Sequence, residues 1–79
     1  MLNKKLIQYN LEEAQEEIEG MLEKVKSPGE YSETAYLHSM QHLIHHINIA
    51  WNARSVAPDD FEKTGRSQWS HFPTDLKLI

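Results

Sequence analysis

The stretch that decides the fold is residues 35–54, AYLHSMQHLIHHINIAWNAR, which holds four of the five histidines of the chain and one of its two tryptophans. A helix turns by about 100° per residue, so a helical stretch of this length has distinct faces. Imidazoles share one face, at His38, His42 and His45, and this face is a candidate site. Apolar side chains share the opposite face, which we expect to be the core: Tyr36, Met40, Leu43, Ile47, Ala50 and Trp51.

The segment before it, residues 3–26, has the pattern of another amphipathic helix. Glu12 and Glu13 come early in this segment and Lys24 and Lys26 come at its end, where we expect the helix dipole to favour each charge. We expect the outward face, which carries most of the glutamates, to be solvated. The apolar residues recur at alternating spacings of four and three, close to a heptad seam: Ile7, Leu11, Ala14, Ile18, either Met21 or Leu22, and Val25.

A break separates the two helical segments at Ser27-Pro28-Gly29. Pro28 lacks a backbone donor and Gly29 tolerates a positive φ, so the first helix should end before this pair. We predict a turn over residues 27–33 and a helix over residues 34–55, capped by Ser32 or Thr34. The two helices then form an antiparallel hairpin. Its two apolar seams are expected to pack against each other: Ile7, Leu11, Ile18 and Leu22 against Trp51, Ile47, Leu43 and Met40.

Residues 56–79 form a tail that we expect to complete the domain. Pro58 followed by two aspartates is typical of the start of a short helix, which Gly65 would end. Beyond Ser67 the pattern predicts an extended tail folded back on the hairpin. The predicted fold class is therefore mainly α, a single small domain over residues 1–79. The tail has too many apolar anchors for a disordered segment: Phe61, Trp69, Phe72, Leu76, Leu78 and Ile79.

Length and composition limit what the chain can do. A chain of 79 residues buries a marginal core, and without cysteine it has neither a disulfide nor a thiolate metal ligand. Association would bury more apolar surface, because two hairpins joined through their seams form a four-helix bundle, and so we expect a homodimer.

The net charge of −4 and the scattered basic residues argue against nucleic-acid binding. No apolar run has the length of a signal peptide or membrane span, which favours a cytoplasmic protein.

The three imidazoles at His38, His42 and His45 raise the possibility of a metal site. Histidines four residues apart on a helix can bind Zn or Ni through their ring nitrogens, and a third from the same face strengthens such a site. The zincin pattern would need a glutamate where Ser39 stands, and the first helix offers no histidine for a di-iron bundle. The alternative is that these histidines hydrogen-bond to the tail as part of the scaffold.

A second group of polar residues crowds the end of the same helix. We take His45, His46, Trp51, Asn52 and Arg54 as candidate contacts to a ligand or partner, with the tryptophan as apolar wall. The structural alternative is that the amides and the guanidinium bond the backbone of the returning tail or one of its acids. No residue set for nucleophilic catalysis is evident, so we predict no catalytic residue.

The run His-His-x-x-x-Ala-Trp-Asn-x-Arg over residues 45–54 resembles a motif of small bacterial proteins of unknown function. In those proteins a short tail with Phe-Pro-x-Asp-Leu follows, which corresponds here to residues 72–76. The resemblance covers the second helix and the tail. It implies no activity, but it implies that the second helix and the Phe-Pro segment belong together.

From the sequence we expect a non-enzymatic module for protein interaction or binding. The unclosed apolar seams and the lack of a catalytic set favour this interpretation. The alternative is a divalent-metal-binding helical protein that uses the histidine face of the second helix.

Overall fold

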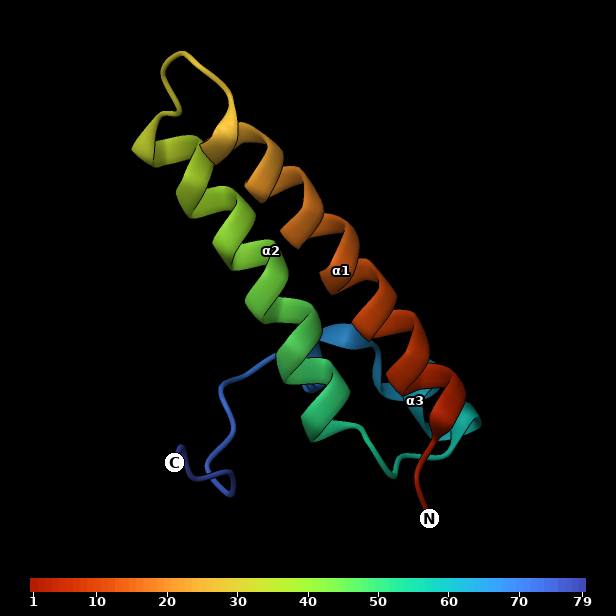
Figure 1. The fold of residues 1–79 in the computed structure, drawn as a ribbon. Helices are drawn as coiled ribbons and strands as arrows, with labels where there is room; N and C mark the ends of the chain where they lie inside the picture. Colours follow the sequence, from red (N-terminus) through yellow and green to blue (C-terminus); the bar gives the residue numbers. More distant parts are fainter.

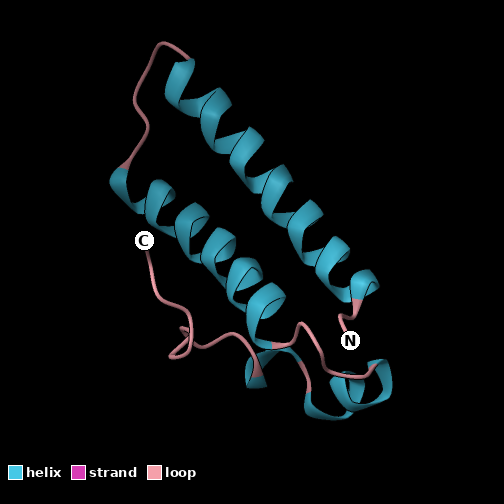
Figure 2. Ribbon diagram, turned by 60° about the horizontal axis from the view of Figure 1, so that its bottom comes forward, coloured by secondary structure: helices cyan, strands magenta, loops and turns pink.

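The computed structural model describes all 79 residues and contains two long helices, one short helix and one 3-10 turn. Helix α1 spans Lys4–Lys26, α2 spans Glu33–Asn52 and α3 spans Pro58–Thr64, and the 3-10 turn η1 spans Arg66–Gln68. The two long helices lie side by side as an antiparallel hairpin, with α3 at its open end (Figure 1). Figure 2 shows no strand, and the predicted mainly α class and helical hairpin are confirmed.

Side-chain oxygens cap the start of both long helices. The Asn3 carbonyl oxygen accepts from the Leu6 amide at 3.2 Å, and the Ser32 hydroxyl accepts from the Ala35 amide at 3.1 Å. At the other end of α1, the Ser27 amide bonds to the Glu23 carbonyl, after which Gly29 takes φ 119°. The break therefore lies at the Pro-Gly pair, as the sequence predicts.

Asn3 also closes the open end of the hairpin. Its backbone amide donates to the Arg54 carbonyl at 2.6 Å, and its side-chain amide donates to the Val56 carbonyl at 2.8 Å. Helix α2 ends at Asn52, three residues before the end at residue 55 that the sequence predicts. Ala53 follows with φ −101° and ψ 17°, and the Arg54 amide bonds to the Trp51 carbonyl three residues earlier.

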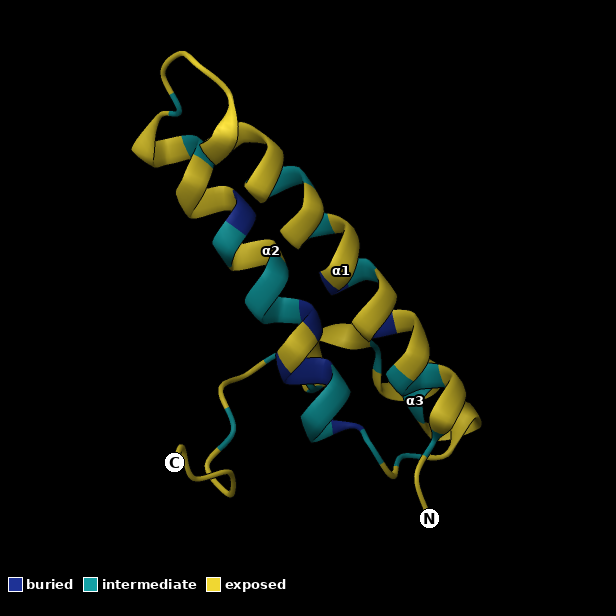
Figure 3. Ribbon diagram, viewed as in Figure 1, coloured by how far each residue is buried: buried dark blue, intermediate teal, exposed yellow.

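The line along which the two long helices meet consists of small and polar residues, with Ile49 as the exception. On α1 it contains Asn10 and Ala14, with exposed fractions of 2% and 4%. On α2 it contains Ser39, His46 and Ile49, with exposed fractions of 8%, 7% and 0%. Small side chains at a contact allow two helix axes to come close, which pushes larger neighbours to the side. Figure 3 shows how few segments are buried; besides those on this line, they are at Asn48 and Ala53 near the end of α2.

The predicted packing of one apolar seam against the other is therefore wrong. Ile47, expected in the core, is 44% exposed, whereas His46 beside it is buried. The apolar stripes are present, but each lies about 80–120° around its helix from the contact line. The stripes are partly exposed because hydrogen-bonded polar residues occupy the contact line.

Both stripes lie on the same side of the hairpin. When each helix is viewed from its N-terminus, its stripe is displaced from the contact line in the sense in which successive residues turn. Since the helices are antiparallel, displacement in the same sense on both leads to one common side. We call this surface the apolar face; its large side chains have exposed fractions between 43% and 63%: Leu11, Ile18, Leu22, Val25, Tyr36 and Ile47.

None of the helices combines the length and the apolar character needed to cross a lipid bilayer. After η1 the chain continues without regular secondary structure, and residues 69–75 contact the last turns of α2.

The burial pattern predicts that Ile49 contributes more to stability than any other aliphatic residue, because it is the only large side chain that is fully buried. Ile49→Ala is expected to lower the unfolding free energy by about 2–4 kcal/mol, measured by urea denaturation. Leu37 on the same helix is 51% exposed, and Leu37→Ala is the control, with an expected change within about 0.5 kcal/mol. Equal losses for the two variants would contradict the assigned core.

Candidate functional site

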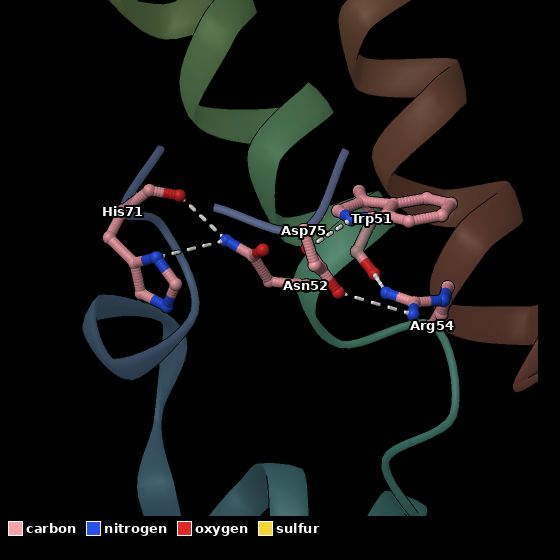
Figure 4. Close-up of polar contacts among 5 residues, drawn as sticks. All are labelled: Trp51, Asn52, Arg54, His71 and Asp75. Carbon is pink, nitrogen blue, oxygen red and sulfur yellow. Dashed lines mark hydrogen bonds and ion pairs between the residues drawn. The ribbon is translucent and has the colours of Figure 1, made fainter. Parts of the chain in front are cut away.

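The structure divides the predicted ligand residues into two groups. His45 and His46 belong to a cluster near the middle of the hairpin, where His46 faces α1. Trp51, Asn52 and Arg54 lie at the end of α2 and contact residues 69–75 (Figure 4). The two groups thus have different neighbours and are treated separately.

Asp75 is the centre of the second group. Its carboxylate accepts from the Trp51 indole nitrogen at 2.9 Å and lies 3.5 Å from the Arg54 guanidinium (Figure 4). The guanidinium in turn lies over the Trp51 ring, 3.7 Å from its centroid, in a cation–π contact. The hydrogen bond from Trp51 holds the pKa of Asp75 below its ordinary value, and the Arg54 charge acts in the same direction.

The side-chain amides of α2 bond to the backbone of the segment that follows η1. Asn52 donates to the carbonyls of Trp69 and His71, at 2.8 and 2.6 Å. One turn earlier, Asn48 donates to the Ser70 carbonyl at 3.0 Å. Carbonyls of a segment without regular structure need such donors, because they have no partner of their own.

A small cavity of about 260 Å³ remains between these groups, beside Asn52, Arg54 and Asp75. The polar groups that a ligand would need are already hydrogen-bonded within the protein. These hydrogen bonds and the ion pair fasten the C-terminal segment to α2. We call these contacts of Trp51, Asn52, Arg54 and Asp75 the tail clasp.

His46 is the centre of the first group. Its Nδ1 lies 2.9 Å from the Asn10 carbonyl oxygen in a buried hydrogen bond between α2 and α1. The Asn10 amide nitrogen donates to the Leu6 carbonyl at 2.9 Å, so the amide oxygen must face His46. Nδ1 of His46 therefore carries the hydrogen and donates it to Asn10. Every buried side-chain nitrogen or oxygen in the protein has a hydrogen-bond partner.

Other rings surround His46. The His45 and His42 rings lie 5.1 and 5.8 Å from it between centroids, and the Tyr9 ring meets it edge-on at 6.4 Å. Burial lowers the pKa of His46, and the neighbouring His45 lowers it further. Burial also lowers the pKa of His45, followed by the charge of Arg66. Both imidazoles are therefore neutral at pH 7 and can act as donor or acceptor.

The histidines proposed as metal ligands are not gathered into a coordination site. No group of three or more histidine, aspartate or glutamate side chains is arranged to hold a metal ion. His38, His42 and His45 line a shallow open depression with Gln41, and the His42 Nδ1 lies 3.4 Å from a Glu17 carboxylate oxygen. The zinc or nickel site stays a prediction for which this geometry supplies no ligand set.

Sequence reasoning missed the importance of Asn10 and Arg66. In the helical pattern Asn10 lies on the same side as Ile7 and Ala14. A polar residue on that side indicates that the contact line is polar. Arg66 follows Gly65, which has φ 77° directly after α3, and it lines a cavity together with Tyr9 and Asn10 of α1. No local pattern in the sequence reveals that contact.

The histidine cluster predicts that mild acid weakens the fold. Because the folded pKa of His46 lies below its unfolded value of about 6.5, the unfolded state binds more protons as the pH falls. Stability is therefore expected to be constant above about pH 7 and to decrease below about pH 6.5. The urea midpoint measured across this range checks the prediction. A midpoint that rises on acidification to about pH 5.5 would contradict it.

The tail clasp predicts a local effect of Asp75→Ala. Loss of the carboxylate removes the acceptor of the Trp51 indole and the partner of Arg54. Amide hydrogen exchange is expected to become faster over residues 69–79, while exchange in the middle of α1 stays unchanged, because the Asp75 carboxylate bonds only to Trp51 and Arg54. Asp59→Ala, an exposed aspartate in α3, is the control. Unchanged exchange in residues 69–79 would show that the clasp does not hold this segment.

Comparison with known proteins adds no assignment to this geometry. No family model, no curated protein and no solved structure matches the chain. A function must therefore be argued from the residues and surfaces described above.

Proposed function

We propose that this protein is a non-enzymatic interaction module in which the apolar face of the hairpin binds a second copy of the chain. Two hairpins joined in this way form a homodimeric four-helix bundle. In the single chain the large side chains of this face are between 43% and 63% exposed.

The observation that carries the proposal is the large surface that one chain exposes. The accessible surface is 6389 Å², whereas a compact monomer of 9.2 kDa exposes about 4,900 Å². The radius of gyration is 14.5 Å, against about 12 Å for a compact chain of this length. The surplus of roughly 1,500 Å² exceeds the approximately 800 Å² per partner that a standard interface buries.

The composition of the face fits a self-association surface. Isolated apolar side chains on a surface are common, but here six large ones lie on one side of a two-helix unit. A helical hairpin has no third element to cover such a stripe, and a symmetric copy supplies it with matching length and spacing.

Charge favours one arrangement of the two copies. Helix α1 contains six glutamates, of which Glu12 and Glu19 border the apolar face, whereas α2 has a single acidic residue, Glu33, in its first turn. Placing α1 of one copy against α2 of the other keeps the glutamate rows apart. This arrangement avoids the like-charge repulsion that two adjacent α1 helices would create.

The polar groups of the protein support a binding role more than a catalytic one. None of the side-chain hydrogen bonds joins a serine or threonine hydroxyl to a histidine; Ser39, for example, pairs with the Tyr31 hydroxyl at 3.4 Å. A neutral histidine without an adjacent nucleophile lacks the pairing on which covalent catalysis depends.

Light scattering coupled to size exclusion tests the proposal. The wild-type chain is expected to be a dimer at about 50 µM, and Ile18→Glu at the centre of the apolar face to be a folded monomer, since a buried unpaired carboxylate costs several kcal/mol. Leu78→Glu, which changes an exposed leucine of the C-terminal segment outside that face, is the control and should remain dimeric. A monomeric wild type with a cooperative thermal transition would overturn the proposal.

A further inference from the structure

We propose that the cavity between the N-terminal end of α1 and α3 is a binding site for a small monocarboxylate with an aromatic or branched apolar body. The cavity has a volume of about 280 Å³ and lies where α3 packs beside the start of α1 (Figure 1). Its size is at the small end of ligand pockets. The inference is independent of the proposed dimer, because the cavity and the apolar face lie on opposite sides of α1.

Apolar and aromatic side chains form the walls of the cavity. Leu6 and Tyr9 line it from α1, and Phe61 and Pro58 line it from α3. The rings of Tyr9 and Phe61 offer flat surfaces for a planar or branched ligand. Ligand pockets of soluble proteins usually combine such walls with a few fixed polar groups.

The site is preorganised by hydrogen bonds that do not involve the ligand. Asn3, at one edge, ties α1 to residues 54 and 56 through its backbone and side-chain amides. Asn10, also part of the lining, is 2% exposed, and both of its amide atoms are engaged by Leu6 and His46. Because these bonds already order the walls, binding costs less conformational entropy.

Two cations without partners determine the class of ligand. Lys5 and Arg66 line the cavity, and neither has a carboxylate within ion-pair distance, since the ion pairs of the protein are His42 with Glu17 and Arg54 with Asp75. This local excess of positive charge contrasts with the net charge of −4 for the whole chain. The guanidinium of Arg66 can bind a carboxylate with two parallel hydrogen bonds.

The third charged group limits the ligand to a single negative charge. Glu62 also lines the cavity, so the lining carries two cations and one anion. One carboxylate neutralises that excess, whereas a second would meet the Glu62 side chain. The site therefore favours a monoanion over a dicarboxylate or a phosphate dianion.

The test uses phenylacetate and its uncharged amide, phenylacetamide, with ¹⁵N-labelled full-length protein in NMR titrations. Phenylacetate is expected to shift the amide signals of residues 6, 9, 10, 61 and 66 with a Kd of about 1 mM. Phenylacetamide, with the same ring but no charge, should bind at least about fivefold more weakly. Arg66→Gln should remove this difference, whereas Lys63→Gln, which changes a cation outside the cavity, should preserve it.

A second readout follows from the position of Arg66. Its charge lowers the pKa of His45 and His46, so a bound carboxylate that compensates this charge should raise both values in an imidazole titration. The charges of Glu13 on α1 and His42 on α2 also affect the pKa of His46. Both groups are present with and without phenylacetate. Arg66→Gln should show no phenylacetate-dependent change.

The proposal is overturned by any of three results. The first is equal affinity for phenylacetate and phenylacetamide. The second is a set of shifted amides remote from α3 and the start of α1. The third is undiminished phenylacetate binding by Arg66→Gln, with circular dichroism confirming its fold.

Discussion

The hydrogen bond between Asn10 and His46 is the constraint on which the rest of the structure depends. It lies on the contact line of the two long helices, where both side chains are almost fully buried. Leaving either group unpaired there would cost about 1–3 kcal/mol, so the bond fixes both the register and the rotation of one helix against the other. With a polar pair at the contact, the apolar stripes must lie beside it. The apolar face is a consequence of this buried hydrogen bond.

Three other asparagine side chains also form hydrogen bonds between separate parts of the chain. Asn3 joins the start of α1 to the loop after α2, and Asn48 and Asn52 hold the backbone of residues 69–71. An amide side chain donates and accepts without carrying charge, which suits contacts between a helix and a chain segment that has no ladder of its own. The protein therefore attaches its irregular parts through amides more than through apolar packing, which explains how it folds with so little buried surface.

The sequence predicted the elements well and the contacts between them only in part. Periodicity located both long helices, and Pro28-Gly29 located the turn, because these signals are local. The same periodicity did not determine which side of each helix meets the other, since a stripe of leucines and isoleucines fits an internal contact and an external one equally well. The buried hydrogen bond of Asn10 determines which side of α1 meets α2. Its partner, His46, lies far away in the sequence. Arg66 was missed for the same reason, because its neighbours come from both long helices.

The two surfaces assigned to binding have a common thermodynamic basis. A chain in which Ile49 is the only large side chain fully buried has little apolar burial to offset the conformational entropy lost on folding. Any partner that binds only the folded state adds its binding free energy to stability. The smaller the stability of the fold on its own, the larger the share that such a partner contributes. An exposed apolar face on one side and an open cationic cavity on the other are therefore consistent with a fold that reaches full stability when it is bound.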